Sequence, residues 1–395
     1  MSESVHLLAV VLPRPAAAEA IVGAWEAGEA VLPLDPDAPG PELARLLAAA
    51  RPTHLLDAAG RSRLAGGRPA APGTAAVVAT SGTGGIPKAV ELDAAALGAA
   101  ARAVSSALDA GQGDRWLCCL PLHGVAGLAI VARAWHGGLP VEVHERFDPG
   151  RVAAVAGRVT LVSLVPAMLP RLRAAGADLS RFRRVLLGGG PIPAELTGGT
   201  LVRTYGLTET FGGVVHDGHP LDGVELRLDG DGGEILLRGP MLFRGYRDDP
   251  ARTAAALRGG WLRTGDLGRR DPASRRLVVL GRLDDLIVTG GVNVHPVEVE
   301  AVLAAHPAVA AVGVRGRPDP RWGQRVAAYV VPRDPAAPPT LAELRAFALE
   351  RLAAAKAPRE LVLVPSLPRG PSGKLLRRLL PGAAAPQEPA ASPAT

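Results

Sequence analysis

Short apolar runs alternate with segments of helical periodicity along the first half of the chain. Residues 22–58 follow the order helix, strand, helix, strand, and a glycine- and proline-rich loop is expected over 61–74. Apolar runs then predict strands at 75–81, 116–122, 139–145, 159–166 and 183–190, and periodicity predicts helices at 93–109, with Asp93 as N-cap, and at 125–138. This alternation favours a mostly parallel, layered α/β structure.

The pattern changes after about residue 212, where short strands separated by Asp-Gly turns are typical of hairpins. A compact α+β segment is expected over 286–378. It comprises helices at 296–305 and 340–354 and strands at 308–315, 325–332 and 360–364. The segment 381–395 is low in complexity and is expected to be disordered.

Composition narrows the classes of function. The chain has 395 residues, 48% of them apolar, which is enough for two or three domains. Aromatic residues make up only 3%, so a stacking platform for single-stranded nucleic acid is not expected. The net charge of +6 is spread along the chain, which argues against a nucleic-acid- or membrane-binding tail. The adjacent Cys118 and Cys119 exclude a disulfide framework and indicate buried strand residues in a reducing compartment.

No stretch of 18 apolar residues predicts a membrane span, and the run at 7–12 is too short for a signal peptide, so a cytoplasmic location is expected. Lysine is the rarest basic residue. It occurs only at Lys88, Lys356 and Lys374, whereas arginine fills the other 41 basic positions. Two of these lysines lie within motifs, which indicates roles that need a compact ammonium group.

The first motif joins an apolar strand to Lys88 through Thr80, Ser81, Gly82, Thr83, Gly84, Gly85, Ile86 and Pro87. Its hydroxyl groups, backbone N–H groups and single ammonium could bind a polyphosphate. It is not a Walker A loop, because Pro87 precedes the lysine and Ala89 follows it. The plain alternative is an ordinary Gly/Ser turn.

Four further motifs are moderate signals when each is taken alone. In the segment 204–210, Glu209 could hold Mg²⁺, Thr208 could bind a phosphate and Tyr205 could stack on a base, or the segment could simply end a strand. Asp266, after Gly265, could accept two ribose hydroxyls or form a turn. The segments 281–300 and 371–378 complete the set, the latter carrying the rare Lys374 in a basic end.

Together, in this order and spacing, the five motifs resemble the adenylate-forming superfamily of acyl-CoA synthetases, over roughly residues 20–380. The resemblance implies ATP, Mg²⁺ and coenzyme A as cofactor or co-substrates. It implies Lys374, Lys88, Thr208 and Glu209 as catalytic residues, with Glu209 on the metal. The implied nucleotide-binding residues are Thr80, Ser81, Gly82, Thr83, Gly189, Gly190, Pro191, Tyr205, Gly206, Thr208, Asp266 and Arg282. Asp284 is the implied hinge, and Gly290 and Gly291 the implied lining of the CoA path.

The resemblance also implies the architecture, namely a large layered α/β domain with a β-rich segment over 1–283 and a small mobile α+β domain over 284–380. The partners implied are a small carboxylic acid, ATP and CoA, without nucleic acid and with a possible homodimer. Two departures stand out: Gly84 replaces a threonine, and Gly124 replaces the histidine of the family's Pro-x-x-His-x-x-Gly element, with His123 one residue earlier.

Within the family, the segments after Pro121, after Glu209 and around Gly290 are most similar to the o-succinylbenzoate–CoA ligases of actinobacterial menaquinone synthesis. That acid carries two carboxylates, so the resemblance implies a second anchor in the acyl pocket. His123, Gly124, Arg133 and Ser163 are the candidate pocket residues. The alternatives are a general fatty or aryl acyl-CoA synthetase and a non-catalytic acyl-nucleotide-binding protein.

Overall fold

The computed structural model describes residues 4–80, 87–190, 192, 196, 198–230, 232–370 and 375–381. Ser81, Gly82, Thr83, Gly84, Pro191 and Lys374 lie outside these residues, as does nearly all of the expected disordered segment 381–395. Clustering of contacts divides the chain into two compact units. One comprises Met1–Arg227 with Leu236–Thr264, and the other Leu228–Ile235 with Gly265–Thr395.

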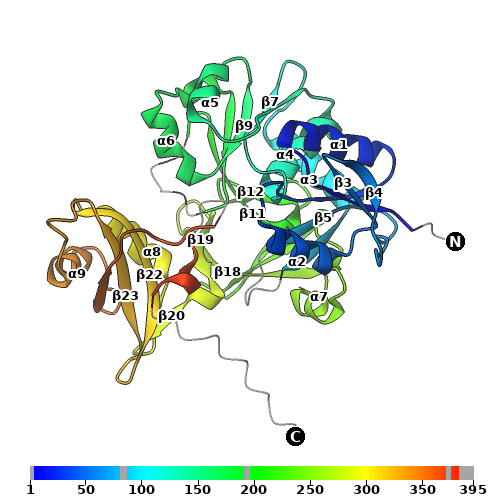
Figure 1. Ribbon diagram of the computed structural model, residues 1–395. Helices are drawn as coiled ribbons and strands as arrows, with labels where there is room; N and C mark the ends of the chain where they lie inside the picture. The colour runs from blue at the N-terminus through cyan, green and yellow to red at the C-terminus, as the bar shows by residue number, and fades with distance from the viewer. Residues whose placement is uncertain are drawn as a thin grey trace, which may run out of the picture. The chain divides into compact units, whose positions relative to one another are not determined.

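The first unit contains two seven-stranded sheets (Figure 1). In the first sheet, the order is β16-β6-β5-β2-β1-β3-β4. The strands are β1 (Leu7–Val10), β2 (Ala30–Pro33), β3 (His54–Asp57), β4 (Gly60–Arg63), β5 (Thr74–Thr80), β6 (Lys88–Asp93) and β16 (Gly245–Tyr246). Strands β1, β2, β3 and β5 are parallel, whereas β4, β6 and β16 pair antiparallel. Helices α1 (Arg14–Glu26) and α2 (Gly40–Ala50) connect the parallel strands.

The second sheet has the order β13-β12-β11-β10-β9-β7-β8. Its strands are β7 (Trp116–Cys118), β8 (Val141–Val143), β9 (Leu161–Leu164), β10 (Arg184–Leu187), β11 (Leu201–Leu207), β12 (Gly212–His216) and β13 (His219–Pro220). Strands β7 to β11 are parallel, and β12 and β13 add antiparallel pairs at one side. In Figure 1, α5 (Pro149–Val155) and α6 (Leu169–Ala174) lie beside β7 and β9, against which their apolar residues pack.

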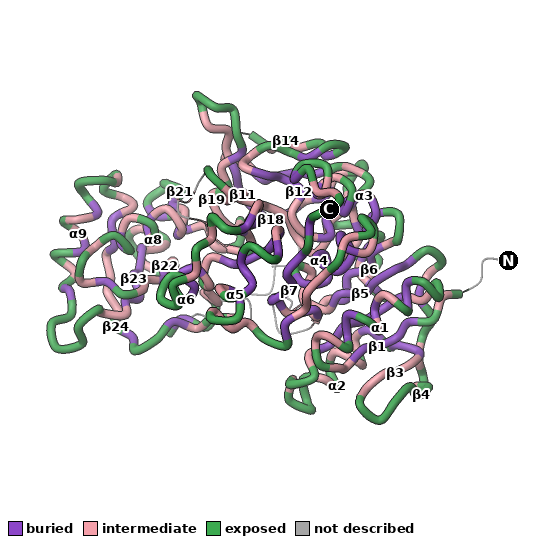
Figure 2. Tube along the Cα trace, turned by 90° about the horizontal axis from the view of Figure 1, so that it is seen from above, coloured by how far each residue is buried: buried purple, intermediate pink, exposed green. Residues whose placement is uncertain are grey.

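Two helices lie between the sheets. Helix α3 (Ala94–Ala107) contacts β5 and β6 of the first sheet and β12 of the second, and it packs along α4 (Val125–Gly137). Every residue of α4 from Gly127 to Ala134 is buried, because neighbours surround the helix. Figure 2 shows buried positions gathered along α4, β5 and β7, and exposed ones along β4. The same burial explains the continuous apolar runs of the parallel strands.

The second unit holds the expected α+β segment. Its sheet has the order β21-β20-β23-β22, with β24 beside β23. The strands are β20 (Ile287–Thr289), β21 (Val292–Val294), β22 (Val309–Asp319), β23 (Gly323–Pro332) and β24 (Glu360–Leu363), and the helices α8 (Pro296–Ala304) and α9 (Leu341–Leu349). Apolar residues of both helices and of the strands form one core, which includes Val299, Val326 and Leu344.

A further sheet has the order β14-β15-β18-β17, with β19 on β18. Its strands are β14 (Glu225–Asp229), β15 (Glu234–Arg238), β17 (Leu257–Arg258), β18 (Trp261–Arg270) and β19 (Leu277–Arg282), and the short helix α7 (Pro250–Ala256) precedes β17. Among the residues that the structure describes, none of the helices combines the length and the hydropathy needed to span a bilayer.

The expected layered α/β architecture is confirmed, and Cys118 and Cys119 are buried and free as expected. Several local expectations are wrong. The segment expected as a loop over 61–74 begins with β4, and the strand expected over 116–122 ends at Cys118. The helix expected over 340–354 spans only Leu341–Leu349.

Asp93 stands at the N-cap of α3, but its side chain makes no capping hydrogen bond. Its carboxylate instead accepts a hydrogen bond from Nε of Arg244 at 2.8 Å. An arginine that is distant in sequence therefore outcompetes the local backbone donors for this acid.

Arg247 joins four segments of the first unit. Its guanidinium, whose side chain is only 2% exposed, donates to Glu91 Oε1 and to the carbonyl of Ala50, both at 2.6 Å. It also donates to the carbonyls of Arg68 and Pro69. A buried guanidinium with this many acceptors fixes the end of α2 and the 68–69 segment against β6.

We expect Arg247→Met to lower the free energy of unfolding by about 3–5 kcal/mol, because it leaves the largely buried Glu91 carboxylate and several carbonyls without a donor. Urea denaturation followed by tryptophan fluorescence measures the change. The matched control is Arg244→Met, whose ion pair with Asp93 is about one-third exposed on both sides and should therefore cost about 1 kcal/mol or less. Equal shifts for the two variants would contradict the structural role given to Arg247.

Candidate active site

Lys88 is the first residue of β6, the strand that follows the phosphate-loop motif. Strands β5 and β6 form an antiparallel pair whose last ladder position joins Thr80 to Lys88, so the ends of the loop are held side by side. The Lys88 Nζ lies 5.4 Å from the ring centroid of Tyr246. The loop residues Ser81, Gly82 and Thr83 lie outside the described part of the chain, and their roles stay predictions.

Thr208 and Glu209 occupy a rigid turn after β11. The 3₁₀ turn Thr208–Thr210 is closed by the buried hydroxyl of Thr210, which accepts from the backbone N–H of Leu207 at 2.9 Å and donates to the carbonyl of Gly212 at 2.7 Å. A Cβ at Gly206 would lie 1.9 Å from that same carbonyl oxygen, so only glycine allows β11 and β12 to come this close. The turn therefore presents Thr208 and Glu209 in a defined position.

Tyr246 links the two motifs. Its hydroxyl donates a 2.7 Å hydrogen bond to Oε1 of Glu209, and the backbone N–H of Phe243 donates to the Glu209 carbonyl at 2.8 Å. Because β16 pairs with β6, the Tyr246 ring also lies beside Lys88. Tyr246 is the main functional candidate that sequence reasoning missed. It is one of only three tyrosines, so the rarity that marked the lysines could have found it.

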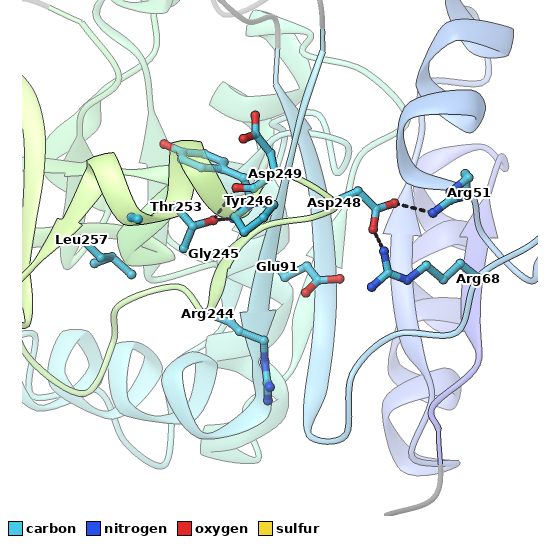
Figure 3. A pocket seen from close by; sticks show the side chains of 12 residues that line it. Arg51, Arg68, Glu91, Arg244, Gly245, Tyr246, Asp248, Asp249, Thr253 and Leu257 are labelled. Atoms are coloured by element: carbon cyan, nitrogen blue, oxygen red, sulfur yellow. Dashed lines mark hydrogen bonds and ion pairs between the residues drawn. The ribbon is translucent and has the colours of Figure 1, made fainter. Parts of the chain in front are cut away.

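One flank of Tyr246 borders a surface pocket of about 720 Å³ (Figure 3). The figure shows the Thr253 hydroxyl, which accepts from the backbone N–H of Tyr246 at 2.9 Å, and Asp248, which pairs with both Arg51 and Arg68. The contact of Thr253 holds the backbone at Tyr246, and the ion pairs of Asp248 hold the chain two residues further on.

The expected adenine-side residues lie at one edge of the second sheet. Gly188, Gly189 and Gly190 follow β10, and Tyr205 lies near the end of the parallel neighbour β11. A Cβ at Gly188 would lie 2.7 Å from Cγ2 of Thr204, and Gly189 has a φ of +79°. Both positions therefore favour glycine, which lets the loop run close to β11. Carboxyl ends of parallel strands are the usual place for a ligand in an α/β sheet.

Asp266 and Arg282, both expected at the nucleotide, lie together in the second unit. They are cross-strand partners on β18 and β19, and Nη1 of Arg282 donates to Oδ1 of Asp266 at 3.1 Å. The preceding Gly265 has a φ of +67°, and its N–H donates to Oε1 of Glu234 at 2.8 Å. A carboxylate accepts hydrogen bonds, which suits recognition of hydroxyl groups.

Arg133 and Ser163, two candidate pocket residues, are in contact. Nη2 of Arg133 donates to the Ser163 hydroxyl at 3.3 Å, and the guanidinium lies 4.7 Å from the ring centroid of Trp116. Arg133 is only 6% exposed, and burial lowers its pKa to about 10, which leaves it protonated at neutral pH. Within the described residues, no carboxylate forms an ion pair with Arg133.

His123 lies in a turn before α4 and takes a different neighbour. Its Nδ1 is 3.9 Å from Oδ2 of Asp35, and burial lowers the pKa of its imidazole. None of the hydrogen bonds or ion pairs recorded for the described residues joins it to Arg133 or Ser163. Gly124 is the N-cap of α4, and a Cβ there would meet only the Pro121 carbonyl, at 3.7 Å. A side chain would therefore fit at this departure from the family.

The expected hinge and CoA-path residues lie in the second unit. Asp284 is exposed in the 3₁₀ turn Leu283–Asp285. Gly290 and Gly291, with φ values of +56° and +77°, form the two-residue turn between β20 and β21, which requires positive φ at both positions. A Cβ at Gly290 would also lie 2.8 Å from the ring of Trp322.

Arg377 anchors the chain just after Lys374, itself outside the described residues. Its guanidinium donates to Asp285 at 3.0 Å and to both carboxylate oxygens of Glu300. Burial raises the pKa of the Glu300 carboxyl, against the opposing effect of Arg377. The segment just after Lys374 is thereby bound to the 3₁₀ turn that carries Asp284.

The side chains present fit a magnesium ion held mainly by its substrate. In the part of the chain that the structure describes, no cluster of three acidic, histidine or cysteine residues could hold a metal alone. Glu209 offers one carboxylate, with one oxygen already accepting from Tyr246. Mg²⁺ is commonly bound by one or two carboxylates together with substrate phosphates and water.

Comparison with known proteins places these residues in a family. The description "AMP-binding enzyme" matches residues 66–247, and "AMP-binding enzyme C-terminal domain" matches residues 298–374. A probable 2-succinylbenzoate–CoA ligase of Mycobacterium tuberculosis is 44% identical over 323 residues, which cover 78% of this chain and 83% of the relative.

Two solved structures of the o-succinylbenzoate–CoA synthetase of Bacillus subtilis are similar over 96% of this chain, at 30% identity. The complex with the acyl-adenylate intermediate has a TM-score of 0.85 and is covered over 88% of its length. The complex with ATP and a magnesium ion has a TM-score of 0.84 and is covered over 90%. With both domain matches and this relatedness, the chain belongs to the AMP-binding enzyme family of adenylate-forming enzymes.

Proposed function

We propose that the protein is an AMP-forming acid–CoA ligase whose acid is 2-succinylbenzoate, the substrate named for its relatives. The observation that carries the choice of acid is the buried Arg133 beside Ser163. A buried cation without a protein carboxylate is costly, and a second carboxylate on the substrate would offset that cost. A simple fatty acid has no second carboxylate and would leave Arg133 without a counter-ion.

The chemistry begins with the acid's other carboxylate, which is a poor electrophile. Its attack on the α-phosphate of ATP forms an acyl-adenylate and releases pyrophosphate, and a CoA thiol then displaces AMP. Lys88 and the loop after Thr80 bind the phosphates, and Lys374 neutralises charge where the carboxylate meets the α-phosphate. Glu209, with Thr208 nearby, would hold Mg²⁺, which neutralises phosphate charge when bound.

The remaining site residues bind the nucleoside. Asp266 accepts hydrogen bonds from the ribose hydroxyls, with Arg282 beside it. Tyr205 and the loop Gly189–Gly190–Pro191 flank the adenine, and Gly206 lets β11 and β12 approach each other at the end of the strand that carries Tyr205.

The two half-reactions need Lys374 in different places. In the second, the CoA thiol must reach the carbonyl carbon of the acyl-adenylate, beside which Lys374 lies in the first. We infer that the domain over 284–380 turns against the domain over 1–283 about Asp284, and that Gly290 and Gly291 then line the CoA path. We also infer a cytoplasmic location, where ATP and CoA are available. Size-exclusion chromatography with light scattering tests whether the protein forms a homodimer.

The first expectation is that the purified protein converts 2-succinylbenzoate, ATP and CoA to the thioester, AMP and pyrophosphate. The assay follows pyrophosphate and thioester separately on a panel of acids, with and without CoA. Comparable turnover of hexanoate or benzoate without activity on 2-succinylbenzoate would assign a general acyl-CoA synthetase instead. Nucleotide binding without turnover of any acid would indicate a non-catalytic binding protein.

Arg133→Met should reduce kcat/KM for 2-succinylbenzoate by about 100-fold, because the lost contact to a desolvated carboxylate is worth about 3 kcal/mol. The same variant should retain activity on 4-oxo-4-phenylbutanoate, which lacks the ring carboxylate. Both acids are measured on both proteins. Equal losses on the two acids would mean that Arg133 supports the fold and does not bind the second carboxylate.

Tyr246→Phe should weaken the apparent affinity for Mg·ATP about 10-fold, because loss of a hydrogen bond to a metal-binding carboxylate loosens its orientation. The ring that faces Lys88 is retained, so the variant tests the hydroxyl alone. Calorimetric titration with Mg²⁺ and a non-hydrolysable ATP analogue gives the affinity. Tyr329→Phe is the matched control, since it removes a hydrogen bond of equal length, 2.7 Å, to Pro381. A similar loss in both variants would refute the assigned role.

A further inference from the structure

Buried polar atoms without partners are concentrated in one place in the first unit. Within the described residues, nine buried side-chain nitrogen or oxygen atoms have no hydrogen-bond partner, and five of them belong to four neighbours, namely Trp116, Arg133, Thr204 and His216. Buried polar groups in native proteins are nearly always satisfied, so a cluster of exceptions indicates a bound polar molecule.

These side chains come from separate elements that meet beneath α4. Arg133 lies on α4 and stacks over Trp116 of β7, and it donates to Ser163 of β9. His216, the last residue of β12, stands opposite Thr204 of β11 in the antiparallel ladder. The two strand residues therefore share a face of the sheet, and α4 contacts β7, β9 and β12. The result is a polar interior lined by one cation and several neutral groups.

His216 supplies a neutral hydrogen-bonding group to this interior. It is 8% exposed, and neither of its ring nitrogens has a partner. Burial, and next the charge of Arg133, lower the pKa of His216 to about 4, so the imidazole is neutral at physiological pH. A neutral imidazole has one N–H donor and one acceptor, and in His216 neither has a hydrogen-bond partner among the described residues.

The proposed acid carries two oxygen groups next to each other. In 2-succinylbenzoate, a carboxylate and the ketone of the succinyl chain stand on neighbouring ring carbons. A receptor for both needs a cation and a neutral donor side by side. Arg133 supplies the cation and His216 the neutral donor. A second cation would gain little from an uncharged ketone.

We propose that His216 is a specificity-determining residue that donates a hydrogen bond to the ketone oxygen of the acid while Arg133 holds the adjacent carboxylate. This inference rests on the proposed function and adds the group that distinguishes a keto acid from its deoxygenated analogue. A site that buries a donor for a substrate oxygen rejects an analogue lacking that oxygen, because the donor is then left unpaired.

The kinetic test compares 2-succinylbenzoate with 2-(3-carboxypropyl)benzoate, in which CH₂ replaces the ketone. The wild-type protein should prefer the keto acid by about 10-fold or more in kcat/KM for adenylation. His216→Phe keeps the ring volume but lacks donor nitrogens, and it should abolish this preference. His216→Gln should restore a substantial part of it, because the amide again provides a donor.

The matched control is His144→Phe. It replaces another buried histidine, just after β8, whose Nδ1 is unpartnered and whose Nε2 lies 3.1 Å from Glu142. It should leave the preference for the keto acid intact. A direct readout is the infrared band of the ¹³C-labelled ketone in the bound acid. The band should lie at lower frequency in the wild-type complex than in the His216→Phe complex, because hydrogen bonding weakens the C=O bond.

The outcomes separate the two claims. Absence of turnover of both acids by the wild-type protein would overturn the proposed function itself. Turnover of 2-succinylbenzoate with no preference over the CH₂ analogue, or with a preference and a carbonyl band unchanged in His216→Phe, would overturn the role of His216 alone. Loss of the preference in His216→Phe and retention in His144→Phe would support it.

Discussion

The two-residue strand β16 is the constraint on which the first unit depends. Its antiparallel pairing with β6 brings Tyr246 to Lys88 and, through the phenol hydroxyl, to Glu209 at the end of a strand of the other sheet. The next residue, Arg247, turns inward and fixes α2, the 68–69 segment and Glu91. One short segment thus contacts both Lys88, the proposed phosphate-binding residue, and Glu209, the proposed metal-binding residue.

The interior beneath α4 shows a second use of burial. Arg133 remains protonated at neutral pH although it is nearly inaccessible, and it contacts the hydroxyl of Ser163 and the indole ring of Trp116. Such an arrangement reduces stability unless a ligand supplies the missing charge. Binding of a ligand carboxylate at Arg133 would therefore stabilise the protein. This favours an acid with two carboxylates over a fatty acid, which has only one.

Local patterns foresaw many of the elements, because each depends on neighbouring residues. The apolar runs of β9 and β10 and the periodicity of α4 and α8 follow from burial on regular faces. The antiparallel strands β4, β6 and β16 were not foreseen. Strand β16 pairs with β6, which is distant in sequence, whereas β4 and β6 each pair with the strand just before them, a local pairing that the polar, glycine-rich pattern of these segments did not reveal. Asp93 illustrates the same limit, because a local cap was expected and Arg244, 151 positions away, took the carboxylate.

By itself, the sequence determined the family and the motif residues, since Lys88, Thr208, Glu209, Asp266 and Arg282 stand in contiguous patterns whose chemistry can be inferred from residue type and spacing. Only the tertiary structure decided that Tyr246 contacts Glu209, that Arg133 lies against Ser163, and that the charge of Arg133 acts on the buried His216. The reason is physical. A motif reports the groups a short segment offers, whereas a pKa, an ion pair or an unmet hydrogen bond depends on which distant elements exclude water around it.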